Sequence, residues 1–135
     1  MTLYVCLDDR NGMLFNKRRQ SRDAAVLADI CANLPGALTI TPFSEKLIQN
    51  AQIPCTLAPE DLTFLPSDAH FFLETPVSES VIANADTIVL YHWNRHYPAD
   101  TYWEIDLPQS GFTLTGVCEF PGKSHETITK EVYTR

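Results

Sequence analysis

The chain has 135 residues, of which 44% are hydrophobic and 20% are charged, a balance that is ordinary for one globular domain. This composition excludes wholesale disorder, a fibrous chain and a disulfide-stapled miniprotein. Ten Lys and Arg residues against seventeen Asp and Glu residues give a formal charge of −7, which excludes an extended nucleic-acid-binding surface because like charges repel. We therefore expect a single domain over residues 1–135.

The first third of the chain predicts a strand, a loop and a helix. Residues 2–7 form a continuous apolar run, which is typical of a strand buried on both faces. Residues 8–20 are polar and predict a turn and a long loop, whose order the sequence leaves open. Ser21 is the expected cap of a helix over about 22–33. The apolar residues at helical spacing, which we expect to face the core, are Val26, Leu27, Ile30, Cys31 and Leu34.

Strands and helices continue to alternate after this helix. Further strands are predicted at 37–41, 70–74 and 87–92, and helices at about 42–51, with Thr41 as cap, and 76–85, with Ser78 as cap. Residues 52–68 contain three prolines and predict a mostly irregular segment. Two alternating runs joined by residues 121–125 predict a terminal hairpin. The expected fold is α/β, with a mainly parallel central sheet, helices on both faces and a C-terminal antiparallel β-hairpin.

Cysteine use predicts a protein of the cytoplasm. The four cysteines include no CxxC pair, so we expect free thiols. Cys6, Cys31 and Cys118 lie in apolar runs and are predicted to be buried, whereas Cys55 follows a proline in a loop and is the one candidate for a reactive thiol. The apolar N-terminal run is short and is followed directly by Asp8 and Asp9, which favours neither a signal peptide nor a membrane span.

A basic cluster precedes the first predicted helix. Lys17, Arg18, Arg19 and Arg22 place four of the ten basic residues within six positions. Because backbone N–H groups at a helix N-terminus also attract anions, this segment is a candidate site for a phosphate or carboxylate. The alternative is a solvated loop whose charges offset the neighbouring acidic residues.

Two further places are candidate ligand sites. Asp23 is interpreted either as a buried acid that binds a heterocyclic ligand or moves a proton, or as a plain first-turn helix acid. His92, Trp93, Arg95 and Asp100 gather around the end of a strand, where they either build a binding surface or pack that strand end. No metal site is expected, because His92 and His96, four positions apart, leave a strand for a loop, where this spacing has no fixed geometry.

The element order is similar to that of the dihydrofolate reductase fold. The segments that resemble this family are 9–13 after the first strand, Asp23 at the position of the family's active-site acid, 41–48, 85–92, 100–103 and the hairpin at 111–135. The resemblance implies a scaffold that binds a small heterocyclic substrate and a dinucleotide.

Three departures from that family concern its substrate and cofactor sites. Glu74-Thr75-Pro76 stands where the family has a glycine pair, and Arg18-Arg19-Gln20 replaces the L-P-W of its substrate loop. The middle of the chain, which holds the family's nucleotide-binding subdomain, is also shorter. A carboxylate and a proline allow neither close backbone approach nor extra N–H donors to a pyrophosphate. We therefore predict no bound cofactor.

Three hypotheses of function remain open. The first is a binding domain without reductase activity, whose ligand is a small anionic or nucleotide-like molecule or a protein partner; basic residues 17–22 and segment 92–104 then line one cleft. The second is a minimal NADP-dependent reductase. The third is a metal-dependent nucleotide hydrolase or nuclease that uses acids such as Asp8, Asp9 and Asp100. The sequence decides neither whether the chain is an enzyme nor whether it forms a homodimer.

Overall fold

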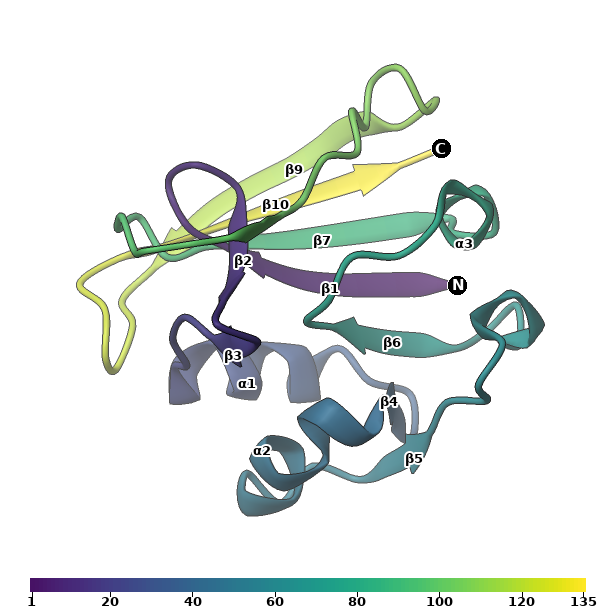
Figure 1. The fold of residues 1–135 in the computed structure, drawn as a ribbon, viewed down its shortest axis with the longest axis horizontal. Helices are drawn as coiled ribbons and strands as arrows, with labels where there is room; N and C mark the ends of the chain where they lie inside the picture. The colour runs from purple at the N-terminus through teal and green to yellow at the C-terminus, as the bar shows by residue number, and fades with distance from the viewer.

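A seven-stranded sheet forms the centre of the computed structural model, which describes residues 1–135. Its strand order is β5-β4-β6-β1-β7-β10-β9, and Figure 1 shows these strands side by side from β5 to β9. The parallel strands are β1 (Thr2–Leu7), β4 (Leu38–Ile40), β5 (Cys55–Leu57), β6 (His70–Leu73) and β7 (Thr87–His92). The antiparallel strands at one edge are β9 (Thr113–Phe120) and β10 (Ile128–Thr134).

Helices cover both faces of this sheet. Successive residues of β1 point to opposite sides, so Val5 joins one apolar cluster and Tyr4 joins the other. Helices α1 (Ala24–Ala32) and α2 (Glu45–Asn50) pack on the side of Tyr4. Helix α3 (Glu79–Ala83) and the 3-10 turn η2 (Leu62–Phe64) pack on the other side. The expected α/β class, with a mainly parallel sheet and a terminal antiparallel hairpin, is confirmed.

The helix starts differ from the sequence prediction. Asp23, and not Ser21, caps α1, because its Oδ1 accepts the Ala25 N–H at 2.8 Å. The expected helix after Thr41 begins as the 3-10 turn η1 (Pro42–Ser44), and the Thr41 hydroxyl makes no capping bond. Ser78 precedes α3 as predicted, but its side chain does not cap the helix either.

A second, three-stranded sheet lies within the segment that the sequence predicts to be a loop. It consists of β2 (Gly12–Phe15), β3 (Arg18–Arg19) and β8 (Thr101–Tyr102), in the order β3-β2-β8. Asn16 and Lys17 join β2 to β3 and both have positive φ, as a two-residue hairpin turn of type I′ requires. This hairpin places the basic cluster above the end of the central sheet.

The segment 52–68 is mostly irregular, as predicted, but it also contains strand β5, which pairs with β4 at the edge of the sheet. The predicted burial of two cysteines is wrong. Cys31 and Cys118 are exposed, because Cys31 lies on the outer side of α1 and Cys118 lies on the edge strand β9. No helix in the structure has the length and apolar character needed to cross a membrane.

Candidate functional site

A cleft lies at the carboxyl ends of the parallel strands, between β3 and α1. Cys6, Glu74 and Trp93 come from or follow the ends of three neighbouring strands, β1, β6 and β7. This is the edge at which open α/β sheets bind ligands. We call this space the cleft; its other walls include Met13, Arg19, Gln20, Ser21, Arg22, Leu27, Leu47 and Phe72.

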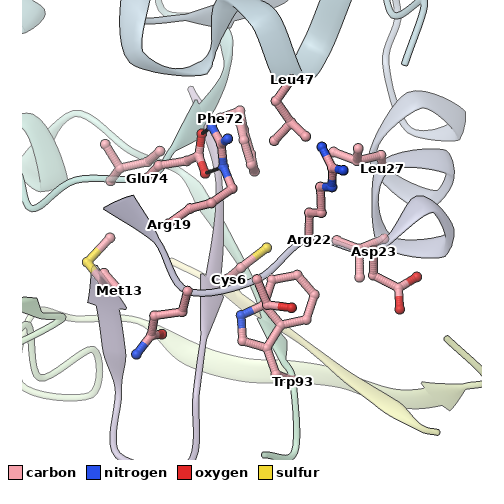
Figure 2. Close-up of a pocket in the computed structure, with 14 residues that line it drawn as sticks. Cys6, Met13, Arg19, Arg22, Asp23, Leu27, Leu47, Phe72, Glu74 and Trp93 are labelled. Carbon is pink, nitrogen blue, oxygen red and sulfur yellow. Dashed lines mark hydrogen bonds and ion pairs between the residues drawn. The ribbon is translucent and has the colours of Figure 1, made fainter. Parts of the chain in front are cut away.

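An ion pair closes much of the cleft. The guanidinium of Arg19 donates to both carboxylate oxygens of Glu74 at 2.7 Å, and the Ser44 hydroxyl donates to the same carboxylate at 2.7 Å. Figure 2 shows Arg19 and Glu74 paired beside Phe72. The cavity that remains measures about 20 Å³, which is room for one water molecule. A larger ligand therefore needs the Arg19 side chain to move.

Arg22 is the cation of the cleft that has no acidic partner. Its side chain is exposed and makes no ion pair, and its guanidinium lies beside Leu27 in Figure 2. Lys17 and Arg18, also unpaired, lie on the outer hairpin and do not line the cleft. The structure thus brings Arg19 and Arg22 together and leaves the other two basic residues outside.

Asp23 is buried and fully hydrogen-bonded within the protein. Its carboxylate accepts the backbone N–H groups of Lys123, Ser124 and His125, as well as that of Ala25, at 2.8–3.1 Å. Burial alone raises the pKa of this carboxyl, but the hydrogen bonds outweigh burial and lower the pKa to about 2. The carboxylate points away from the cleft in Figure 2. Asp23 therefore joins the loop after β9 to the start of α1.

His125 also contacts Asp23, and no pattern in the sequence singled it out as a site residue. Its Nδ1 lies 2.9 Å from Asp23 Oδ2, and its Nε2 lies 3.1 Å from Ser21 Oγ and 2.9 Å from the Tyr97 hydroxyl. The imidazole stacks on Trp93, with ring centroids 4.6 Å apart and an interplanar angle of 17°. Trp93, which lines the cleft, thus covers one face of His125 in a polar network formed by Asp23, His125, Ser21 and Tyr97.

Comparison with known proteins identifies the fold. No protein-family model matches the sequence, and no curated protein matches it. The structure is similar to that of a dihydrofolate reductase from Enterococcus faecalis complexed with NADP(H) and RAB-propyl. The TM-score is 0.68, over 99% of this chain and 95% of that chain, at 8% sequence identity. The expected dihydrofolate reductase-like fold is confirmed. At this identity the likeness concerns the fold alone.

The residues after β6 do not fit a dinucleotide. The fold suggests a dinucleotide cofactor, but the residue that follows β6 is Glu74. Its side chain carries a carboxylate and is only 10% exposed. A pyrophosphate placed there meets a like charge, and Pro76 has no N–H to donate. Glu74 is also already engaged by Arg19 and Ser44.

Asp8 holds the small sheet against the end of β1. Its buried carboxylate accepts the backbone N–H groups of Arg10, Gly12 and Tyr97 and the side-chain amide of Gln20. Burial alone raises the pKa of this carboxyl, but the hydrogen bonds have the larger effect, so the net shift of the pKa is downward. The Gln20 Oε1 atom is buried and has no hydrogen-bond donor. Gln20 lines the cleft, but less than 1 Å² of this oxygen is accessible, so a ligand in the cleft reaches it only when a neighbouring side chain moves.

The remaining predicted residues lie apart from one another. His92 lines a depression on the other face of the sheet, where its Nε2 contacts Glu131. Arg95 is exposed on the loop after β7, and Asp100 accepts the Asn16 N–H at 3.0 Å on the outer hairpin. Of the segment 92–104, Trp93 alone lines the cleft. No three His, Cys, Asp or Glu side chains are grouped so that they could hold a metal ion.

Proposed function

We propose that residues 1–135 form one domain that binds a small anionic, nucleotide-like ligand in the cleft and that this domain performs no hydride transfer. One observation supports the proposal: Arg22, which makes no ion pair, and Gln20, whose buried Oε1 has no hydrogen-bond donor, line the same cleft with apolar walls. A guanidinium recognises a phosphate or carboxylate, and a free carbonyl oxygen recognises an N–H group. A ligand with both groups satisfies both residues.

The walls of the cleft favour a flat ring between these polar groups. Leu27, Leu47, Phe72 and Trp93 supply apolar and aromatic surface. Small-molecule sites commonly combine such walls with a few polar groups that fix the orientation of the ligand. Entry requires Arg19 to leave Glu74, and the released guanidinium then gives the ligand a second cation. Binding is therefore expected to weaken as salt concentration rises.

Thermal shift with a panel of defined compounds tests this function. The panel contains inorganic phosphate, citrate, AMP and NADPH. We expect AMP to raise the melting temperature more than phosphate does, and Arg22→Glu to weaken AMP binding about tenfold or more, as loss of a charged hydrogen bond implies. Arg10→Glu changes the net charge equally on an exposed residue outside the cleft and is the matched control.

Other outcomes separate the alternatives. A shift with NADPH alone favours a reductase; a ligand at one hundred times its dissociation constant adds about 2.7 kcal/mol of stability. Mg²⁺-dependent release of phosphate from AMP favours a nucleotide hydrolase. If no panel member binds, or if both charge reversals act alike, the proposed anion site is wrong. The four free cysteines support a reducing compartment such as the cytoplasm for this activity.

A further inference from the structure

The buried polar network beside the cleft contains a serine, a histidine and an aspartate in a continuous hydrogen-bonded row. Ser21 Oγ lies 3.1 Å from His125 Nε2, and His125 Nδ1 lies 2.9 Å from Asp23 Oδ2. The histidine and the aspartate are 5% and 1% exposed, whereas Ser21 is half-buried and lines the cleft. A nucleophile, a base and a group that orients the base are thus within hydrogen-bond reach of one another.

The hydrogen bonds of Asp23 determine which nitrogen of His125 carries the proton. The pKa of Asp23, about 2, keeps its carboxylate ionised near neutral pH, and an ionised carboxylate only accepts hydrogen bonds. His125 Nδ1 must therefore be the N–H donor to Asp23, which leaves the lone pair on Nε2. That lone pair faces the Ser21 hydroxyl and can take its proton.

Aromatic contacts hold the imidazole in this orientation. Trp93 stacks on one face of the His125 ring at 4.6 Å between centroids, and Tyr97 meets the ring edge at 6.2 Å. The Tyr97 hydroxyl donates to Ser21 Oγ at 3.3 Å. When Tyr97 donates to the serine oxygen, the serine proton is directed toward Nε2. The Tyr97 hydroxyl also lies 2.9 Å from Nε2, and its single proton goes to only one acceptor at a time, so Ser21 is ready to lose its proton when Tyr97 donates to Ser21 and not to Nε2.

The surroundings of Ser21 are positive on the side of the cleft. Helix α1 begins three residues later, and the backbone N–H groups of Ala24 and Val26 in its first turn have no acceptor in the protein. Arg22, next in the chain, presents its unpaired guanidinium to the cleft. The dipole of this helix end favours negative charge that develops near it.

We propose that Ser21, His125 and Asp23 form a catalytic triad that hydrolyses carboxylic esters with an anionic acyl group. Ser21 Oγ bonds to the ester carbonyl carbon while its proton moves to His125 Nε2. The ester C–O bond then breaks, and the departing oxygen takes that proton from Nε2 and leaves as the alcohol. Water next attacks the acyl carbon, gives a proton to Nε2, and the acid leaves as Ser21 Oγ regains that proton. The sum is ester plus water giving acid plus alcohol.

The two parts of this proposal have different foundations. The triad rests only on the geometry of the three side chains. The preference for an anionic acyl group rests on the proposed function, because it requires Arg22 to bind an anion in the cleft. The test therefore includes one neutral and one anionic substrate of the same leaving group.

Covalent labelling tests the nucleophile directly. A fluorophosphonate forms a phosphonyl ester with an activated serine oxygen and releases fluoride, and peptide mass spectrometry locates the adduct. We expect one adduct, on Ser21, in the wild-type protein, and at least tenfold slower labelling in His125→Gln. Ser80→Ala removes an exposed hydroxyl on α3, far from the cleft, and is the control that labels like the wild type. No adduct on Ser21 in the wild-type protein overturns the triad.

Ester hydrolysis tests the reaction and its specificity. With p-nitrophenyl acetate and p-nitrophenyl hemisuccinate, we expect Ser21→Ala to lower kcat/KM about 1,000-fold or to the buffer rate. Activity that survives Ser21→Ala overturns the triad even if His125→Gln fails to fold. We expect Arg22→Glu to lower the ratio of hemisuccinate to acetate turnover about tenfold. Hydrolysis that needs Ser21 but shows no preference for hemisuccinate supports the triad and contradicts the anion site.

Discussion

The imidazole of His125 and the carboxylate of Asp23 are 102 positions apart in the sequence, yet Nδ1 and Oδ2 lie 2.9 Å apart. Asp23 caps α1, and His125 closes the loop between β9 and β10. The contact therefore ties the terminal hairpin to the first helix. It also places a potential base within 3.1 Å of a hydroxyl that lines the cleft. The same hydrogen bonds stabilise the fold and shape the candidate site.

Acid is expected to destabilise the protein through Asp23. The pKa of its carboxyl in the folded protein is about 2, below its ordinary value of 3.8, because hydrogen bonds outweigh the effect of burial. The ionised form thus stabilises the fold by about 2 kcal/mol above pH 4, and this contribution is lost as pH falls from about 4 to about 2. Urea unfolding from pH 7 to pH 2 measures this loss.

Two substitutions assign that loss to Asp23. Asp23→Asn is expected to lower the free energy of unfolding at pH 7 by about 2–3 kcal/mol and to flatten its dependence on pH between 4 and 2. Asp9→Asn is the matched control, since the Asp9 side chain is exposed and makes no hydrogen bond. If Asp23→Asn leaves the pH dependence as steep as Asp9→Asn does, Asp23 is not the responsible group.

Gly122 is expected to tolerate no side chain. A Cβ atom at this position lies 2.5 Å from the His125 carbonyl oxygen and 2.6 Å from Asp23 Oδ2, so the loop has to shift. We expect Gly122→Ala to destabilise the fold by about 1–3 kcal/mol, as overpacking commonly does. Gly36→Ala is the control: a Cβ there meets nothing within 4 Å, and the change is expected to stay within about 0.5 kcal/mol. Equal melting temperatures for the two variants contradict this account.

Most strands of the central sheet could be predicted, because they are apolar or alternating runs flanked by clear turn residues, whereas the three-residue β5 could not. The run at 87–92 contains branched residues and becomes β7 with the expected bounds. The small sheet could not be predicted in this way. Its strands have two to four residues, and its turn reads Asn16-Lys17, without the glycine that usually marks such a hairpin.

The candidate site was predictable only in part for a related reason. The sequence shows that Arg19 and Arg22 belong to a group of basic residues just before a helix, and both residues line the cleft. The partners of Asp23 are not visible, since they come from a loop about one hundred residues later. Contacts between residues far apart in the sequence depend on the order of strands in the sheet, and the periodicity of apolar residues along the chain does not predict them.

Thiol reactivity is expected to differ sharply among the four cysteines. Cys31 and Cys118 are exposed, whereas burial, followed by the charges of Glu74 and Asp23, raises the pKa of the Cys6 thiol. A thiolate is the reactive form, so Cys6 is expected to react with Ellman's reagent only after unfolding. Cys31→Ser with Cys118→Ser should remove the fast phase from the absorbance trace. A fast phase that persists in this double variant places the reactive thiol elsewhere.

Glu74 is expected to restrain ligand entry, because it holds Arg19 across the cleft at 2.7 Å. Glu74→Gln removes the charge and keeps the size of the side chain, so it frees Arg19 to meet an anion. We expect it to cost about 1.5 kcal/mol of stability, as loss of a charge-assisted hydrogen bond implies, and to strengthen AMP binding severalfold.

The variant Ser44→Ala serves as the control for this last change. It removes the other hydrogen bond to Glu74 but leaves the ion pair with Arg19 in place. We therefore expect a loss of stability without tighter AMP binding, as measured by titration calorimetry at fixed ionic strength. If Glu74→Gln weakens AMP binding, the carboxylate itself is part of the ligand site, and the Arg19–Glu74 pair is a binding element. Tighter AMP binding in Glu74→Gln therefore means that Glu74 restrains ligand entry, and weaker AMP binding means that Glu74 contacts the ligand.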